Sequence, residues 1–177
     1  MATSLPVITG NAIGGVQTMP PIQDLVIRRA SLHDAADVHR ILISAFAPFE
    51  EEYTRLAYAA TVLSPAEIVE RMAEGPIWVA ASSNSTIGTA SAVVSKKELY
   101  LRSVAVLPEF AGNGVARRML KHVENFAARK ECERIRLSTT RFLFAAHRLY
   151  CRCGYRQVDD ESEDLFGTPL VGMEKGI

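Results

Sequence analysis

The sequence predicts a single α/β domain built on one mixed, twisted sheet of about six to seven strands flanked by helices. Apolar runs rich in β-branched residues alternate with segments whose apolar residues recur at helical spacing. With 177 residues, 48% of them hydrophobic, the chain can bury one substantial core but is too short for two ordinary domains. We therefore expect the domain over residues 24–177, after a flexible or arm-like leader over residues 1–23 that carries no charged side chain.

The first half of the domain is expected to hold one strand and two helices. Residues 25–29 predict the strand, and Ser31 with Asp34 forms a capping box in front of the first helix. The apolar face of that helix follows the helical period, at Val38, Ile41, Leu42, Ala45 and Phe46. A second helix is expected to begin at Ser64, where Glu67 completes another capping box.

The second half is expected to begin with a meander and to continue with alternating helices and strands. The meander strands are predicted over residues 77–81, 86–94 and 99–106, the first two joined through Asn84 and Ser85. The later elements are a helix ending near Lys130, a strand near 134–138, a helix containing Tyr150, and strands near 155–158 and 169–174.

A glycine-bearing turn in the stretch 106–118 leaves the last meander strand and opens the next helix. Gly112 and Gly114 let a ligand approach the backbone, and the N–H groups of the first helical turn point outward with the positive end of the helix dipole. Arg117 and Arg118 oppose that dipole unless an anion lies nearby. The turn therefore predicts a cradle for a pyrophosphate, with an ordinary loop and solvated arginines as the alternative.

A dinucleotide is one candidate ligand for such a turn. A dinucleotide site needs Gly-x-Gly-x-x-Gly and an acidic residue at the far end of the next strand. Here Arg117 occupies the third glycine position, and Glu133 falls at the start of the next strand. Both departures disfavour a dinucleotide.

The same turn resembles the signature of the GCN5-related N-acetyltransferase (GNAT) superfamily, Arg/Gln-x-x-Gly-x-Gly/Ala after a strand that ends in Val-x-Pro. This chain has Val106 and Pro108, followed by Gly114 and Ala116. It departs at the first position of the motif, where Ala111 replaces the usual Arg or Gln. The resemblance covers roughly residue 25 to the C-terminus.

A second segment, residues 146–155, resembles the family's Ala-x-x-Leu-Tyr-x-x-x-Gly-Phe sequence, in which a helix ends at a glycine before a strand. The resemblance implies that Tyr150 protonates the departing CoA thiolate, which a phenol can do only within hydrogen-bond reach of the sulfur. Core packing is the alternative role, because Tyr150 shares a helical face with other apolar residues. Leu143 replaces an asparagine that the family often has three residues before the segment.

The resemblance also implies that acetyl-CoA is the cosubstrate and lies between two splayed strands, 99–106 and 134–138. It places the cofactor-binding residues at Val104, Ala105, Val106, Ala111, Gly112, Asn113, Gly114, Val115, Ala116, Arg117 and Arg118. The pyrophosphate would be held mainly by backbone amides of the turn. An amide N–H near the end of the strand 99–106 would polarise the thioester carbonyl.

Two residues of the strand before the turn are candidates for contact with the acceptor amine. Alignment by spacing puts Tyr100 where family enzymes often have a carboxylate, so Tyr100 is expected to bind the substrate. Glu98 alternates to the same face and is a candidate general base acting through water. The alternative for Glu98 is a solvated acid at the strand's start.

Phe49 and Glu50 are the remaining candidates for substrate binding. They lie in an aromatic and acidic segment, residues 46–53, that in the resembled family commonly lines the acceptor side. Residues 159–164 form a second acidic run. Two acidic loops would attract a cationic amine, although such runs are usually only solvated.

Composition excludes several other functions. The formal net charge is zero, which gives no electrostatic attraction to nucleic acid, and no apolar run approaches the ~18 residues that cross a membrane. The three cysteines give neither a disulfide framework nor a metal-ligand pattern, which favours a reduced, cytoplasmic protein.

We therefore expect an N-acetyltransferase, without a metal, that moves an acetyl group directly from acetyl-CoA to a small-molecule or peptide amine. Homodimers are common in the resembled family. The alternative is a non-catalytic acyl-CoA-binding or regulatory module, for which Ala111 and Leu143 are the arguments.

Overall fold

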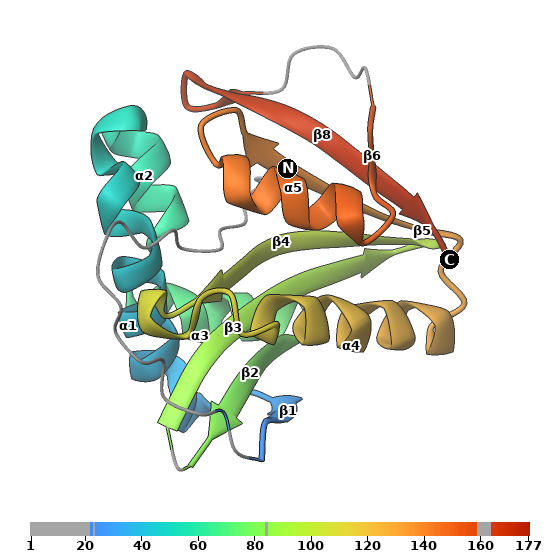
Figure 1. Ribbon diagram of the computed structural model, residues 1–177, viewed down its shortest axis with the longest axis horizontal. Helices are drawn as coiled ribbons and strands as arrows, with labels where there is room; N and C mark the ends of the chain where they lie inside the picture. The colour runs from blue at the N-terminus through green and yellow to red at the C-terminus, as the bar shows by residue number, and fades with distance from the viewer. Residues whose placement is uncertain (1–21, 23, 84, 159–163) are drawn as a thin grey trace.

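The computed structural model describes residues 22, 24–83, 85–158 and 164–177, so the expected leader, except for Ile22, lies outside the described residues. The described chain forms an eight-stranded sheet in the order β1-β2-β3-β4-β5-β8-β6, with β7 paired to β8 (Figure 1). The strands are β1 (Val26–Arg29), β2 (Ile77–Ser82), β3 (Ser85–Ser95), β4 (Glu98–Val106), β5 (Arg134–Thr140), β6 (Arg156–Gln157), β7 (Asp164–Leu165) and β8 (Thr168–Gly176). All neighbouring strands are antiparallel except β4 and β5, so the predicted mixed α/β sheet is confirmed.

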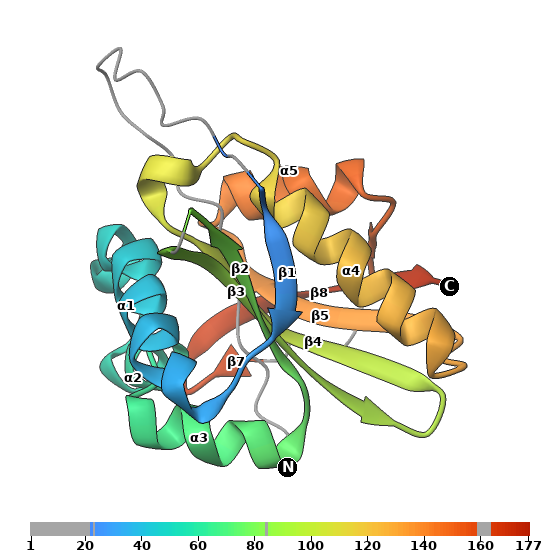
Figure 2. The same cartoon turned by 90° about the horizontal axis from the view of Figure 1, so that it is seen from below.

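Helices cover both faces of the sheet. The α-helices are α1 (Ala35–Phe46), α2 (Arg55–Thr61), α3 (Pro65–Glu74), α4 (Val115–Arg129) and α5 (Phe144–Arg152). Figures 1 and 2 show α4 and α5 on one face, and α1 and α3 on the other. The buried apolar side chains of both layers meet the sheet in one continuous core.

Both predicted capping boxes are present. In front of α3, the Ser64 backbone N–H donates to Glu67 Oε2 at 2.8 Å, and the Ser64 hydroxyl accepts from the Glu67 N–H. Ser31 and Asp34 form the other box, which precedes a single 3₁₀ turn (Leu32–Asp34) rather than α1 directly. These reciprocal bonds satisfy N–H groups that a helix start leaves without partners.

The sequence did not predict three short elements. The 3₁₀ helix η2 (Ala47–Glu52) and helix α2 follow α1, and β7 precedes β8. Only Ala57 and Thr61 of α2 are buried, so that helix has no apolar stripe to reveal it. Its start depends on a tertiary contact as well, because the Thr54 hydroxyl caps α2 and also donates to the Phe166 carbonyl oxygen at 2.8 Å.

The feature that most affects the site is the separation of β4 from β5. Their parallel ladder joins residues 98–101 to residues 134–137 and ends at the pair Leu101 and Leu137. Strand β4 nevertheless continues to Val106 and β5 to Thr140. The register between β3 and β4 also shifts here, leaving Arg102 as an extra residue in β4. The central strands therefore splay apart at a β-bulge.

Within the described residues, no helix combines the length and the apolar character needed to cross a membrane.

Candidate active site

The turn after β4 exposes its backbone at the start of α4. A 3₁₀ turn, η3 (Pro108–Phe110), leads into Gly112 with φ +81° and Gly114 with φ +76°. Gly114 is the N-cap of α4, and a Cβ atom at either glycine would meet no atom within 4 Å. Glycine adopts this left-handed conformation without strain, and the open space leaves the backbone accessible to a ligand.

The first turn of α4 supplies N–H groups to this space. The Arg118 N–H already bonds to the Gly114 carbonyl oxygen at 3.0 Å, as the first hydrogen bond of the helix. Val115, Ala116 and Arg117 precede it, and N–H groups at these positions have no acceptor inside an α-helix. Together with the helix dipole, they form the kind of site that holds a phosphate group.

A cavity of about 630 Å³ lies between this turn and α5. Its lining combines the turn and the first residues of α4 with one face of α5, and consists of Val106, Phe110, Ala111, Gly112, Gly114, Val115, Ala116, Arg117, Ala145, Arg148, Leu149, Arg152 and Cys153. The volume falls in the range of small-molecule and cofactor sites. Three arginines around an open backbone suit a ligand that carries phosphates.

Seven of the predicted cofactor residues line this cavity: Val106, Ala111, Gly112, Gly114, Val115, Ala116 and Arg117. Asn113 lies beside them, and its buried Nδ2 has no hydrogen-bond partner among the described residues. Val104 and Ala105 are buried in the part of β4 that lies beyond the β5 ladder.

The contacts of Arg118 differ from its predicted role in binding the cofactor. Its guanidinium donates to the Leu25 carbonyl oxygen at 3.0 Å, and its backbone N–H is used within α4. Arg118 is absent from the described cavity lining. It therefore anchors the chain in front of β1 and presents neither its side chain nor its amide to a phosphate.

Two arginines of α5 were missed by sequence reasoning. Arg148 and Arg152 line the cavity opposite Ala111, the position where the motif lacks its usual Arg or Gln. They are four residues apart and so share one helical face with Ala145 and Leu149. That stripe was the available signal, but charged residues at this spacing also occur on ordinary solvated helices.

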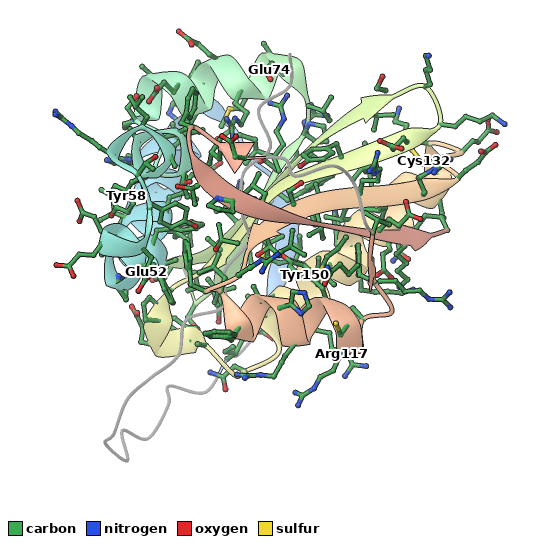
Figure 3. The ribbon with its side chains drawn as sticks, turned by 90° about the horizontal axis from the view of Figure 1, so that it is seen from above. Glu52, Tyr58, Glu74, Arg117, Cys132 and Tyr150 are labelled. Atoms are coloured by element: carbon green, nitrogen blue, oxygen red, sulfur yellow. The ribbon has the colours of Figure 1, made fainter. Side chains whose placement is uncertain are left out.

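Tyr150 is fully buried and is not among the residues that line the cavity, although its helix neighbours Leu149 and Arg148 are. Figure 3 labels it on α5, from which its ring makes an edge contact with Tyr155 at 5.6 Å between centroids. The Tyr150 hydroxyl has no hydrogen-bond partner in the described structure. Burial, followed by nearby Tyr155 and Cys153, raises the pKa of Tyr150 well above 10, so the phenol keeps its proton.

The two candidates on β4 lie at its start, far along the strand from the turn. Glu98 pairs with Arg134 at the start of the ladder between β4 and β5, and the distance between Arg134 Nε and Glu98 Oε2 is 3.7 Å. The Tyr100 hydroxyl donates to Ser138 Oγ at 2.8 Å and so joins the two strands near their point of separation. Of the two, Tyr100 is the one positioned at the splay.

Phe49 and Glu50 lie on η2 beside the end of β5. The Phe49 ring stacks on Phe142 at 6.3 Å between centroids, whereas Glu50 is exposed. Glu50 is nevertheless close enough to Tyr58 to raise the pKa of that phenol, after the larger effect of burial. Of the second acidic run, residues 159–163 lie outside the described residues.

Leu143 is buried in the core as the N-cap residue of α5, so it offers no polar contact to a ligand. Among the described residues, no group of three or more His, Cys, Asp or Glu side chains is arranged to hold a metal ion.

The splayed sheet, the glycine turn and the adjoining cavity are the features expected of the acetyl-CoA-dependent acyltransferase class. The family model "Acetyltransferase (GNAT) family" matches residues 36–155, more than half of the chain. The chain belongs to this family.

One curated relative is the N-acetylaspartate synthetase of Danio rerio, which is 33% identical over 100 residues. The match covers 55% of this chain and 34% of the relative, so the chain spans about a third of that relative's length.

Solved structures share the fold. The PaiA N-acetyltransferase of Thermoplasma acidophilum, in complex with coenzyme A, has a TM-score of 0.76 at 15% identity and covers 88% of this chain and 100% of its own. The ribosomal-protein-S18-alanine N-acetyltransferase of Escherichia coli has a TM-score of 0.69 at 16% identity, with 86% and 94% covered. The yncA protein of Salmonella typhimurium, solved with its cofactor acetyl-CoA, has a TM-score of 0.66 at 20% identity, with 87% and 94% covered.

Proposed function

We propose that this protein transfers an acetyl group from acetyl-CoA to a primary amine by direct attack of the amine. The observation that carries the proposal is the cavity formed by the glycine turn, the start of α4 and α5, next to the point where β4 separates from β5. The exposed turn backbone and three arginines fit the phosphates of CoA, and the open edge of β4 fits an extended pantetheine arm.

Bound acetyl-CoA supplies an acetyl group activated as a thioester. The backbone of the turn and the first turn of α4 bind its pyrophosphate, with Arg117, Arg148 and Arg152 at the same cavity. Beyond Leu101, the amide groups of β4 that face away from β3 lie outside the β5 ladder and are available to orient the thioester carbonyl. The protein thus aligns the two reactants and stabilises charge, which is most of what this reaction requires.

Tyr150 provides the proton for the departing sulfur. In the reaction the amine nitrogen bonds to the acetyl carbon and the carbon–sulfur bond breaks. The amine gives up a proton through water to Glu98, and the sulfur takes the proton of Tyr150. The Tyr150 phenol is protonated at neutral pH, and its hydroxyl lacks a competing partner in the described structure. The free hydroxyl supports the acid role, although the raised pKa makes this phenol a weaker acid than tyrosine in water.

A covalent route through a cysteine is less well supported. Cys153 lines the cavity, but burial raises the pKa of its thiol, and Glu124 raises it further. A thiol with a raised pKa forms less of the nucleophilic thiolate at neutral pH. The environment of Cys153 therefore favours direct transfer over an acetyl-cysteine.

The acceptor is a small-molecule or peptide amine. The name of the Danio rerio relative suggests an amino acid as acceptor. The exposed acidic residues of η2 suggest attraction of an ammonium group, which a polyamine and an amino acid both carry. We further propose that Glu98 acts as a general base through water. The proposal also includes a cytoplasmic location and assembly as a homodimer.

Ala111 and Leu143 are the specific observations that favour the alternative, a module that binds acyl-CoA without turnover. The test is release of free CoA thiol from acetyl-CoA, measured with and without a panel of amines. Amine-dependent release supports the enzyme. Saturable acetyl-CoA binding without release on any amine would favour the binding module.

A further inference from the structure

A compact group of charged residues lies on the other side of the sheet from the cofactor cavity. Arg102, the extra residue of the β4 bulge, donates from Nη1 to Oε2 of Glu74 at the end of α3. Arg71, one turn earlier on α3, is near enough to both that its pKa responds to them. Figure 3 shows Glu74 on the opposite side of the molecule from Arg117. We call Arg71, Arg102 and Glu74 the arginine cluster.

The arginine cluster has more hydrogen-bond donors than it satisfies. Glu74 and Glu67, which lies one turn before Arg71 on α3, both attract the Arg71 guanidinium, but neither bonds to all of the buried donors. Arg102 Nε and Arg71 Nη1 are both buried and have no hydrogen-bond partner within the described residues. Buried polar groups of native proteins are almost always paired, and unpaired charged ones are especially costly.

A purely structural role explains only part of this arrangement. One arginine bonded to Glu74 would suffice to pin α3 to β4, yet a second is held beside it. Burial, followed by the like charge of Arg102, lowers the pKa of Arg71 to about 10. An anion between the two guanidiniums would attract both of them and raise the pKa of Arg71 again.

Access and position both favour an anionic ligand here. The Arg102 side chain is 6% exposed whereas that of Glu74 is 53% exposed, so the arginine cluster runs from the protein interior to solvent. Arg102 also follows Leu101, the last residue of β4 that pairs with β5. A ligand at the cluster would lie beside the opening between these strands, on the face away from α4 and α5.

We propose that Arg71 and Arg102 bind a carboxylate of the acceptor, which makes the acceptor an amine that also carries a carboxylate, such as an amino acid. This inference rests on the proposed function, because it assigns the acceptor of that same reaction. A guanidinium offers two parallel N–H donors that match the two oxygens of a carboxylate. Glu74 holds Arg102 in place and is a positioning residue.

The test compares acceptors that differ in one carboxylate: alanine with alaninamide, aspartate with asparagine, and glutamate with glutamine. We expect wild-type kcat/KM to favour the carboxylate member of at least one pair by about tenfold. The Arg71→Met variant should reduce that preference to within about twofold, and Arg71→Lys should restore it only partly. Arg129→Met, on the exposed end of α4, is the matched control and should keep the preference.

A binding measurement separates this inference from the proposed function. The carboxylate member of the preferred pair should raise the melting temperature of the wild type, with or without acetyl-CoA, and should not raise that of Arg71→Met. The unliganded Arg71→Met variant should melt no lower than the wild type, because the cost of burying the Arg71 charge is the largest effect on its pKa and is removed.

The possible results distinguish the carboxylate-site inference from the proposed acetyl transfer. Equal kcat/KM within every pair, transfer only to amines that lack a carboxylate, or a preference unchanged in Arg71→Met would overturn the inference and leave acetyl transfer intact. Carboxylate-dependent stabilisation that Arg71→Met abolishes, in a protein that does not bind acetyl-CoA, would support the anion site and overturn the proposed function instead.

Discussion

The Tyr100 hydroxyl donates a 2.8 Å hydrogen bond to Ser138 Oγ and so links β4 to β5 next to the last rung of their ladder. The link lies where the strands begin to separate. Splaying that began later would leave less of the β4 edge open to a ligand. We therefore expect these two side chains to affect the width of the opening between the strands.

Tyr100→Phe removes this link while keeping the ring. We expect the free energy of unfolding to fall by about 1 kcal/mol, because one partly buried hydrogen bond is lost. We also expect KM for the amine to rise more than kcat falls. Chemical denaturation and steady-state kinetics measure the two effects. Unchanged stability and unchanged KM would show that the bond does not shape the site.

Tyr150→Phe tests the proton donor. The variant should lower kcat by about 10²-fold while leaving the acetyl-CoA dissociation constant nearly unchanged. Its stability should stay close to that of the wild type, since the buried hydroxyl has no hydrogen-bond partner in the described part of the chain. Turnover, calorimetry and thermal melting are the measurements. A normal kcat would assign Tyr150 to packing alone, and loss of cofactor binding would make it structural.

Arg148 and Arg152 are expected to take over the role of the arginine or glutamine missing at Ala111. Replacing either with alanine should weaken acetyl-CoA binding about tenfold, or about 1.4 kcal/mol, because a charge-assisted contact to a phosphate is lost. Calorimetric titration measures the change, with Arg129→Ala as a control on the exposed end of α4. If all three variants bind alike, the phosphates do not lie against α5.

The Arg28 and Asp34 pair predicts how stability depends on acid. Asp34 accepts two bonds from the Arg28 guanidinium, at 2.7 and 2.8 Å, and this pairing holds the pKa of Asp34 well below its usual 3.8. The folded-state pKa is therefore lower than the unfolded one. The stabilisation from Asp34 is complete above about pH 4 and is lost as the pH falls further.

Asp34→Asn should accordingly destabilise the protein by about 2 kcal/mol at neutral pH. The difference from the wild type should shrink as the pH is lowered below about 4. Melting temperatures of both proteins between pH 7 and pH 3 measure this. A constant difference across that range would contradict the assigned linkage.

Much of the fold was predictable because it is encoded locally. The capping boxes, the alternation of the meander strands and the glycines of the turn each act within a few residues of one another. Helix α2 and strand β7 were missed because both are short and are held by contacts across the fold. Thr54, the N-cap of α2, bonds to Phe166, which directly follows β7. A short element stabilised by tertiary contacts has little sequence signal of its own.

The residues of the candidate site also divide into those that the sequence could place and those that it could not. The turn residues could be placed from their motif, and the Tyr150 position from its helix. The side chain of Arg118 could not, because its partner at Leu25 is remote in sequence. Arg71 and Arg102 meet only because a bulge in β4 lies against the end of α3, and neither register nor bulges can be read from periodicity.

The most direct test of the central claim is calorimetric titration of acetyl-CoA into ligand-free wild type and into Ala145→Trp. Ala145 lines the cavity from α5 and is half-buried, so tryptophan should fill the cavity without disturbing the core. The wild type should bind in the micromolar range, with free CoA competing, and Ala145→Trp should bind at least tenfold more weakly. Absence of wild-type binding up to millimolar concentrations, or equal binding by the filled variant, would contradict the assignment of this cavity to acetyl-CoA.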